Sequence, residues 1–448
     1  MSGWRFAIHP GDNHFARMKN RDVSLPHIVV LGAGFAGLKF CQAFPTELAR
    51  ITIVDRQNHH LFQPLLYQVA TAGLSATDIA QPVRGILSDK PNVVVRMAEF
   101  TGFDLPEKKV FLEGDELGYD YLVIALGGAA SYFGHDEWAQ YAPSLKSLDD
   151  ALKIRRQILL GFEKAENEPD EQCRRELMTT VVVGGGPTGV ELAGAFSELA
   201  RNVLRKDFDH IDPTKARVVL VEGGPRVLGA FPPDLSARAQ RQLEKLGVEV
   251  HTGLHVQDIR AREVVLPNET IRAGNIIWAA GVAASPLGKK LGVETDRGGR
   301  VKVLPDLSLP GHPEVFALGD MITLIDKKGQ PVPGLCPAAL QMGEYVAKLL
   351  ARELGSDRKQ LAERKPFGYF DKGTMATIGR SSAVAMVGPV HFSGYPAWLA
   401  WLGIHLLFLI GFRNKFSVLT QWVYSYLTYK RGARIITGLS GEKSAGSA

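Results

Sequence analysis

The residues best suited to chemistry are two glycine triplets, each followed by an acidic residue at the end of an apolar run. Glycines spaced as G-x-G-x-x-G let the backbone approach a pyrophosphate, and the later carboxylate can accept hydrogen bonds from a ribose diol. Two such sets about 150 residues apart predict two dinucleotide sites in one chain. The first set is Gly32, Gly34, Gly37 and Asp55, and the second is Gly184, Gly186, Gly189 and Glu222.

The elements around the first set follow a strand–helix–strand order. A β-branched run, Ile28–Leu31, precedes Gly32, a helix-like segment follows Gly37, and a second apolar run, Ile51–Val54, ends at Asp55. In this order the first glycine makes the tight turn, the second admits the pyrophosphate, and the third allows close helix–strand packing. The helix N-terminus then presents unpaired N–H groups to the phosphates.

The second set repeats this design with a longer connection. Glu222 lies 33 residues after Gly189, farther than the usual spacing, so segment 201–215 must lengthen the helix or its loop. A carboxylate at this place repels a 2′-phosphate and favours NADH over NADPH, a preference that Arg226 nearby weakens slightly. A bare glycine-rich turn is the alternative for each motif, but the strand, helix and acid around each favour a dinucleotide site.

Three further apolar runs would connect these units. The run Val315–Met321 is a strand that ends in Gly319 and Asp320, and Pro337 later begins a helix-like run, since proline is favoured at the first helical position. The similar runs 119–127 and 275–282 both end in small residues. Close approach to a cofactor and simple strand-end packing both explain those small residues.

Composition indicates a globular protein of two or three domains, with 448 residues, 45% of them hydrophobic and 22% charged. The net charge of +5 comes without a basic block interleaved with aromatics, so no nucleic acid is expected. Cys41, Cys173 and Cys336 form no CxxC pair, which argues against a disulfide framework, a zinc ribbon and a redox dithiol. No metal site is predicted. Segment 1–24 lacks the apolar core of a signal peptide, and we expect a flexible extension there.

The C-terminal segment is unusually apolar. From Ala397 to Phe412 the only polar side chain is His405, yet this run has 16 residues and spanning a bilayer takes about 20. A second stretch has apolar residues at helical spacing and therefore predicts an amphipathic helix. Its apolar residues are Leu419, Trp422, Val423, Tyr426 and Leu427.

Basic residues accompany this apolar end. After Arg380 six basic residues are opposed by one acid, Glu442, which suits an anionic lipid surface. The six are Arg413, Lys415, Lys430, Arg431, Arg434 and Lys443. One spanning helix and a helix in the interface both remain open for 397–412, and the pattern as a whole favours monotopic attachment. A homodimer interface or a buried core is the alternative, and a dimer could also present a joined apolar platform.

Together these segments resemble the two-dinucleotide-binding-domain flavoproteins, above all the type II NADH:quinone oxidoreductases, from about residue 26 to about residue 438. The most specific stretches are Asn58–Ser75, Gly184–Leu199, Val315–Met321, Asp371–Arg380 and Trp398–Asn414. The resemblance implies FAD in the first site and NADH in the second. It also implies hydride transfer from NADH to flavin, then two-electron reduction of ubiquinone or menaquinone, without proton pumping. Such a protein would dock on the lipid bilayer at the cytoplasmic face of the inner or plasma membrane.

The resemblance also implies roles for single residues. Gly319 and Asp320 would join the first glycine set in binding FAD, and the helix at Pro337 would direct its positive end at the flavin pyrimidine edge. Glu191 matches a glutamate near the nicotinamide and flavin and would position groups or handle protons. Its alternative is a helix-start carboxylate stabilised by the dipole.

Gln341 and Lys372 match positions that line the family's quinone pocket, although Lys372 could also be a solvated loop lysine. The chain departs from the family pattern nearby. The AQxAxQ pattern of many members is replaced by Cys336–Gln341, with Pro337 in place of the first glutamine. Proline cannot donate a hydrogen bond to a quinone carbonyl.

The predicted fold is α/β, with two Rossmann-like dinucleotide-binding domains and C-terminal amphipathic membrane-docking helices. We expect an FAD domain at 25–150 and 282–345, an NADH domain at 151–281, and a quinone-site and membrane-anchoring region at 346–448. A soluble FAD-dependent NAD(P)H reductase of a ferredoxin-like protein is an alternative that the apolar tail disfavours. A sulfide:quinone oxidoreductase would need suitably placed cysteines. A redox sensor that binds flavin and NADH would differ in lacking sustained turnover.

Overall fold

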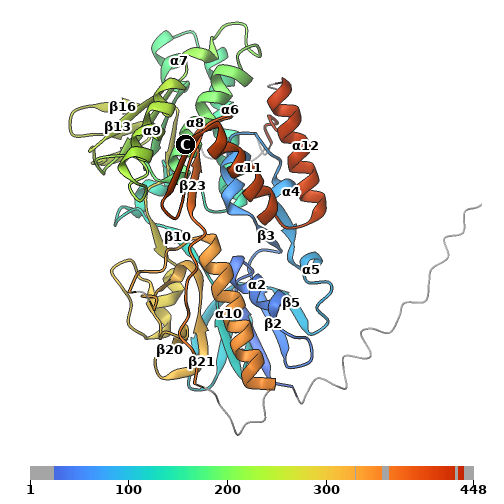
Figure 1. Cartoon of the computed structure of the whole chain (residues 1–448). Coiled ribbons are helices and arrows are strands. Elements are labelled where there is room, and N and C mark those ends of the chain that lie inside the picture. Colours follow the sequence, from blue (N-terminus) through green and yellow to red (C-terminus); the bar gives the residue numbers. More distant parts are fainter. Residues whose placement is uncertain (1–24, 328, 356–362, 429–431, 438–448) are drawn as a thin grey trace, which may run out of the picture.

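The computed structural model describes residues 25–327, 329–355, 363–428 and 432–437. The extension predicted at 1–24 lies outside these residues, as do Lys430, Arg431, Glu442 and Lys443. Two parallel sheets organise the chain, one in the lower half and one in the upper half of Figure 1. The predicted α/β class is therefore confirmed, whereas the exact domain boundaries stay predictions.

The strands of the first sheet come from two parts of the chain, one before and one after the segment that forms the second sheet. Its strands, in spatial order, are β20 (Ser308–Leu309), β21 (His312–Ala317), β9 (Tyr121–Ile124), β1 (His27–Leu31), β2 (Arg50–Asp55) and β5 (Val93–Met97). Neighbours pair in parallel, except that β20 pairs antiparallel with β21. The central strand β1 is buried on both faces, which explains its unbroken apolar run.

Two helices cover one face of this sheet and pack tightly against each other. They are α2 (Phe35–Ala43), which follows the first glycine loop, and α10 (Cys336–Gly355). A Cβ on Gly343 would lie 2.2 Å from the backbone oxygen of Ala36, so this contact requires glycine. The N-termini of both helices therefore lie at the same edge of the sheet, where the parallel strands end (Figure 1).

The second sheet has the order β13 (Val248–Thr252), β12 (Arg217–Glu222), β11 (Thr179–Val183) and β17 (Asn275–Trp278), all parallel. Helix α8 (Pro187–Glu198) follows its glycine loop and continues as a π-helical turn at Leu199–Val203. This turn, a loop and a short 3₁₀ helix at Pro213–Lys215 account for the predicted long connection. Around this sheet lie α6 (Leu148–Glu166), α7 (Glu171–Leu177) and α9 (Pro233–Lys245).

The two predicted connecting strands are confirmed as β9 and β17, each beside the first strand of its sheet. The segments that follow them pair with one another, β10 (Gly128–Ala130) antiparallel to β18 (Val282–Ala284). The chain therefore passes between the two sheets through a two-stranded link.

Shorter elements complete the molecule. They are β3 (His59–Leu61), α3 (Leu66–Ala70), α4 (Ala76–Ile79), β4 (Ala80–Pro82), α5 (Val83–Ile86), β6 (Phe100–Asp104), β7 (Lys109–Leu112), β8 (Asp115–Gly118), β14 (Asp258–Arg260), β15 (Glu263–Val265), β16 (Thr270–Arg272), β19 (Val301–Lys302) and β22 (Ile322–Thr323).

The C-terminal region packs a three-stranded sheet and two helices beside α3, α4 and α8. Its elements are β23 (Thr374–Thr377), β24 (Ala383–Val387), β25 (Val390–Gly394), α11 (Tyr395–Phe408) and α12 (Phe412–Thr428). The backbone is extended at Leu409, and Gly411 takes a positive φ of 82°. The apolar run that starts at Ala397 is therefore interrupted between α11 and α12. Among the described residues, no helix combines the length and the apolar character needed to cross a bilayer.

The predicted last helix is confirmed as α12, and its apolar residues are divided between the protein interior and the surface. Trp422 is buried and its indole N–H donates to Gln68 Oε1 at 2.9 Å, whereas Leu419, Val423 and Leu427 are 44%, 51% and 78% exposed. The stripe is wide enough that one edge packs on the protein, together with the fully buried Val418. The other edge faces outward.

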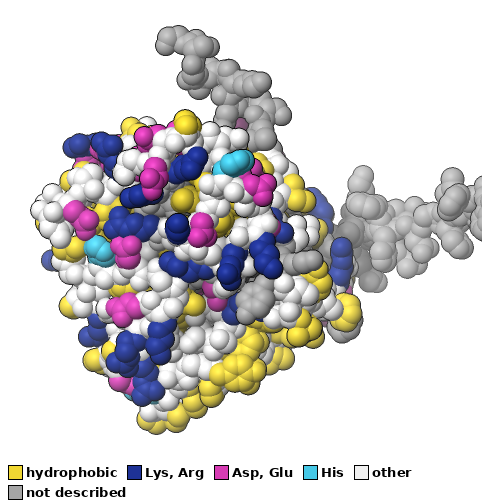
Figure 2. Space-filling model, turned by 90° about the horizontal axis from the view of Figure 1, so that it is seen from above, with side chains coloured by type: hydrophobic (Ala, Val, Ile, Leu, Met, Phe, Trp, Pro, Cys, Tyr) yellow, Lys and Arg dark blue, Asp and Glu magenta, His cyan; other side chains and the backbone are white. Residues whose placement is uncertain are grey.

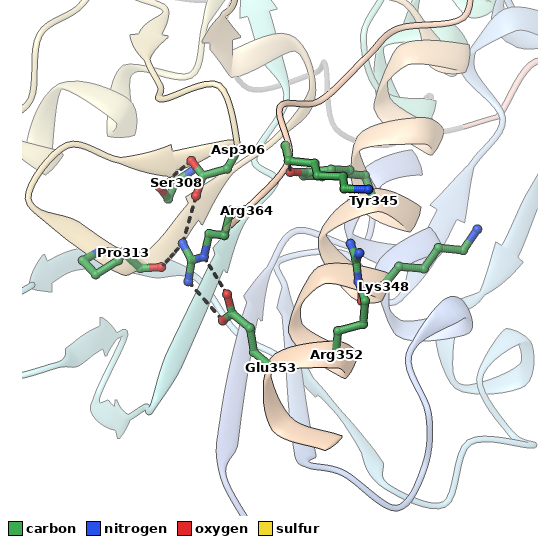
Figure 3. A network of polar contacts seen from close by, with 9 residues as sticks. Asp306, Ser308, Pro313, Tyr345, Lys348, Arg352, Glu353 and Arg364 are labelled. Atoms are coloured by element: carbon green, nitrogen blue, oxygen red, sulfur yellow. Dashed lines mark hydrogen bonds and ion pairs between the residues drawn. The ribbon is translucent and has the colours of Figure 1, made fainter. Parts of the chain in front are cut away.

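A partly buried ion network fixes the C-terminal end of α10 (Figure 3). The Arg364 guanidinium donates to Asp306 Oδ2 at 2.9 Å and to both carboxylate oxygens of Glu353, at 2.6 and 3.1 Å. It also donates to the Pro313 carbonyl at 2.8 Å. Arg364 thereby holds the segment that leads to β23 against α10 and the β20–β21 hairpin.

Candidate functional site

The first glycine loop is sterically fixed at two positions and open at the third. Gly32 has φ +99°, and a Cβ there would lie 2.4 Å from the backbone oxygen of Ala125, just after β9. A Cβ on Gly37 would lie 2.0 Å from the Gly32 oxygen, whereas no atom of the described residues lies within 4 Å of a Cβ on Gly34. The backbone after β9 thus requires glycine at position 32, and the open space lies over Gly34, the residue predicted to meet a pyrophosphate.

The second loop has the same geometry. Gly184 has φ +111° and its Cβ would meet the backbone of Ala280, after β17, at 2.5 Å. A Cβ on Gly189 would lie 1.8 Å from the Gly184 oxygen, and within the part of the chain that the structure describes no atom lies within 4 Å of one on Gly186. The two loops therefore share one design: the outer glycines are required for packing, and the middle one leaves its helix N-terminus approachable.

Both predicted ribose-binding acids also hold their own loops. Asp55 Oδ2 accepts a hydrogen bond from the N–H of Ala33 at 2.7 Å. Glu222 Oε2 accepts one from the N–H of Gly185 at 2.6 Å, and its Oε1 accepts one from Gly224 at 2.6 Å. Each carboxylate lies at the end of the second strand of its unit, beside the first glycine turn, as the spacing predicts.

The first site contains two polar groups that sequence patterns missed. His60 is buried on β3, and its Nδ1 pairs with the Ala33 carbonyl at 3.0 Å, while its Nε2 has no hydrogen-bond partner among the described residues. Lys146, before α6, is half-buried, which lowers its pKa, and the Asp320 charge opposes that shift. An unpartnered buried nitrogen, a buried cation and an open glycine fit a polar, anionic dinucleotide such as FAD. Neither residue carries a local motif, since both come near the loop only in the folded chain.

Gly319 and Asp320 follow β21 at the edge where α2 and α10 begin. Gly319 has φ +76°, and a Cβ there would lie 3.8 Å from the Cβ of Ala339 and 3.9 Å from that of Ala36. Its N–H donates to Met342 Sδ at 3.2 Å. Helix α10 begins at Cys336, one residue before the predicted Pro337. The Gly-Asp turn and the N-terminus of α10 therefore lie side by side, while their roles in binding FAD stay predictions.

Gln341 and Lys372 are brought together at the N-terminal end of α10. The Gln341 amide donates to the Phe370 carbonyl at 2.9 Å and accepts from the Phe370 N–H at 2.9 Å. The amide is thus engaged in holding the segment that carries Lys372, whose Nζ lies 5.3 Å from the centre of the Phe408 ring on α11. Nearby, burial and the Asp320 charge raise the pKa of the Cys336 thiol to about 12, so the thiol is protonated at neutral pH.

Glu191 lies on α8 and contacts the C-terminal end of β23, the end farther along the chain from Lys372. Its Oε1 accepts a hydrogen bond from the Thr377 N–H at 3.4 Å, so its partner belongs to the C-terminal sheet. Its residue surface keeps some exposure, yet burial of the carboxyl group raises its pKa to about 8. A carboxyl that is largely protonated at pH 7 can donate as well as accept a proton, which suits acid–base work.

His405, the polar residue within the apolar run 397–412, is enclosed between the C-terminal helices and the core. Its Nδ1 pairs with the Trp401 carbonyl at 2.8 Å, and its ring stacks on Trp401 with centroids 4.1 Å apart. Burial lowers its pKa to about 4, so the imidazole is neutral at physiological pH. A structural role in fastening α11 accounts for these contacts.

Two sheets with matched glycine loops define a class of protein. The family model for pyridine nucleotide-disulphide oxidoreductases matches residues 26–343, and the chain belongs to that family. A solved structure titled "Structure of NDH2 from plasmodium falciparum in complex with NADH" has the same fold, with a TM-score of 0.84 over 92% of this chain and 100% of that chain, at 21% identity.

Sequence relatives define the activity. The chain is 45% identical over 423 residues to the type II NADH:quinone oxidoreductase Ndh of Mycobacterium tuberculosis, covering 92% of this chain and 90% of that protein. It is 43% identical to NdhA of the same organism, covering 92% of this chain and 89% of that protein. The chain is an NADH:quinone oxidoreductase of type II, as its sequence motifs predict.

Proposed function

We propose that FAD binds the first glycine loop and NADH the second, and that the acceptor is a membrane ubiquinone or menaquinone. The observation that carries this assignment is the open space over Gly34 and Gly186, the middle glycines of two otherwise tightly packed loops. In each loop the free N–H groups of a helix N-terminus and a carboxylate at the strand end suit a pyrophosphate and a ribose. Bound FAD would supply the two-electron chemistry that links nicotinamide to quinone.

The residues of this chain would contribute orientation, charge and protons. The N-terminus of α10 places partial positive charge beside Asp320 and Lys146, where it favours negative charge by about 0.3–1 kcal/mol. Lys372 is an exposed donor for a quinone oxygen, and Gln341 positions it through the backbone of Phe370. The carboxyl of Glu191 would hold a proton near the reacting groups.

We propose that α11 and α12 dock on the surface of an anionic bilayer at its cytoplasmic face, without spanning it. Hydrophobic side chains gather along the lower edge of the molecule in Figure 2. Both helices expose large apolar side chains, namely Tyr395, Leu399, Ile404 and Leu407 of α11 and Phe416, Leu419, Val423, Tyr424 and Leu427 of α12. Arg413 and Lys415 lie beside them and suit anionic headgroups. A homodimer that joins two such platforms stays a prediction.

Rapid mixing tests the cofactor and acceptor. Purified protein should show flavin absorbance that bleaches on mixing with NADH and returns on mixing with a ubiquinone or menaquinone analogue in detergent. Protein without flavin would contradict the first assignment. Bleaching that quinones of neither class reverse would contradict the second.

Vesicle flotation tests the docking surface. Leu407 and Leu427 are 73% and 78% exposed, so Leu407→Asp with Leu427→Asp should leave the fold intact. Burying each leucine in lipid contributes about 1.5–3 kcal/mol, so the pair should lower partitioning onto anionic vesicles at least tenfold. Met97→Asp is the control, because Met97 is 63% exposed on β5 of the first sheet. Unchanged flotation of the double variant would contradict the proposed surface.

A further inference from the structure

A small cavity lies between α3, α8, β23 and α12, apart from the glycine loops and from Lys372. Its volume is about 50 Å³, enough for a few water molecules. The inner wall is buried and includes Tyr67, Glu198 and Thr377. The outer wall is half-exposed and includes Arg380 and Ser425. The cavity is therefore a polar space that leads from the interior toward the surface of the molecule.

One glutamate of α8, Glu198, lines this space, and a second, Glu191, lies behind the lining residue Thr377, whose N–H donates to it. Glu191 and Glu198 are seven residues apart, so they share one helix face and stand about 10 Å apart along the axis. Each accepts a backbone hydrogen bond from the C-terminal sheet, Glu191 from Thr377 and Glu198 from Arg380 at 2.6 Å. Gly379 has φ +76°, and a Cβ there would lie 2.6 Å from Glu198 Oε1, so the chain is shaped to receive this carboxylate.

Tyr67 bridges the space between the two acids. The indole N–H of Trp422 donates to Gln68 Oε1, so the Gln68 amide group is turned to donate to the Tyr67 hydroxyl, at 2.9 Å. A hydroxyl that accepts from Gln68 has its own proton left to donate, and the cavity is the space it lines. Burial, with the charge of Glu191, raises the pKa of Tyr67 well above 10, so it relays protons as a neutral hydroxyl.

We propose that this cavity is the proton-uptake path of the enzyme, running from solvent past Glu198 and Tyr67 to Glu191. Reduction of a quinone by NADH follows NADH + H⁺ + Q → NAD⁺ + QH₂, so one proton per turnover comes from water. Glu191 gives its proton toward the quinone and becomes a carboxylate. Water in the cavity, hydrogen-bonded to Tyr67, returns a proton to it, and Glu198 replaces that proton from solvent. The path rests on the proposed proton-holding role of Glu191.

The surroundings of Glu198 suit such a step. Arg380 after β23, Tyr67 on α3 and Tyr426 on α12 line the cavity together with Glu198, and Glu191 lies about two turns earlier on the same helix. The Arg380 guanidinium lies over the Tyr426 ring, 4.8 Å from its centre, at the outer end of the cavity. Arg380 therefore places positive charge at the outer end of the cavity, whereas burial raises the pKa of Glu191, the inner carboxyl, to about 8.

Two variants test the path. Glu198→Gln keeps an acceptor for the Arg380 N–H, and Tyr67→Phe removes only the hydroxyl. Both should leave bleaching by NADH unchanged, slow reoxidation by quinone roughly tenfold, and raise its solvent deuterium isotope effect. Formate should partly restore Glu198→Gln by carrying protons. Glu344→Gln, an exposed glutamate on α10, is the matched control and should behave as the unmodified enzyme.

Infrared spectroscopy supplies a readout that needs no turnover. The protonated carboxyl band of Glu191 should shift on transfer of the resting protein to D₂O, and should do so more slowly in both variants. If Glu198→Gln and Tyr67→Phe both exchange this proton and are reoxidised by quinone at the rates of the unmodified enzyme, the proposed path is overturned. If Glu191→Gln slows reoxidation while these two do not, the role of Glu191 stands and the path alone fails. If Glu191→Gln has no effect, the proposed role of Glu191 is itself wrong.

Discussion

Alanine at the middle glycine of each loop tests where the two pyrophosphates bind. Gly34 and Gly186 have φ values of −70° and −71°, which alanine adopts freely, and a Cβ on either would have no atom of a described residue within 4 Å. Substitution should therefore change the free energy of unfolding by less than about 1 kcal/mol. Any larger loss of function must come from a clash between the added methyl group and the bound dinucleotide.

The expected loss of affinity follows from how closely the open space lets a pyrophosphate approach the backbone. A methyl group on Gly186 would push a pyrophosphate off the helix N-terminus and lengthen one or two charge-assisted hydrogen bonds. Each such bond contributes about 1.5–3 kcal/mol, and 1.4 kcal/mol is a tenfold change in affinity. Gly186→Ala should weaken NADH binding about 10- to 100-fold with the flavin retained, and Gly34→Ala should lower the flavin retained on purification.

The assay combines three measurements on each variant: the NADH dissociation constant from fluorescence quenching, the flavin stoichiometry from absorbance, and the melting temperature. Gly189→Ala is the contrasting variant, because its Cβ would lie 1.8 Å from a backbone oxygen and the fold itself should be destabilised. Gly85→Ala on α5 has open space and should change none of the three. Unaltered NADH affinity in Gly186→Ala, or loss of flavin in that variant instead, would refute the assignment of the two sites.

Three further predictions concern charge. Glu191→Gln should remove the fall in quinone reduction above about pH 8, because the protonated carboxyl is the working form. Its pKa is raised on folding, so the native state loses stability as pH rises from about 4.5 through 8, and the variant should lack that loss in urea titrations at several pH values. Arg364→Ala leaves two largely buried carboxylates unpaired and should lower the free energy of unfolding by about 3 kcal/mol, whereas Lys348→Ala, in an exposed pair, should change it by less than about 1 kcal/mol. Glu222→Ser should raise kcat/KM for NADPH relative to NADH; an unchanged ratio would contradict the role of Glu222 in coenzyme choice.

Sequence predicted the parts of the site whose shape depends on local sterics. A glycine at position 32 or 184 is required by a backbone atom less than 3 Å from its missing Cβ, and such requirements leave a regular spacing in the sequence. The acids at the strand ends follow for the same reason, since the length of a strand and helix fixes where the next strand ends. The two parallel sheets were predictable from these units and their apolar runs.

Residues that act only through distant contacts could not be predicted. His60 and Lys146 reach the first site from β3 and from the turn before α6, and neither belongs to a spaced motif. The cavity walls combine α3, α8, β23 and α12, which meet only in the fold. The division of the last helix into buried Trp422 and exposed Val423 was equally hidden, because both residues are apolar and a helical pattern does not distinguish a protein neighbour from a lipid one.

The acids at the two strand ends do more than the fingerprint rule assigns to them. Glu222 accepts backbone hydrogen bonds from Gly185 and Gly224 with separate oxygens, so it holds the loop before any ligand arrives, and each oxygen keeps a second lone pair for a ribose hydroxyl. Serine at this position removes the support of the loop as well as the charge. Loss of the loop support weakens the binding of NADH and NADPH alike, so it cancels in the ratio of their kcat/KM values. Loss of the charge removes repulsion of the 2′-phosphate, which only NADPH carries, so this effect does not cancel. The ratio, and not the KM for NADH, is therefore the quantity that reports coenzyme choice.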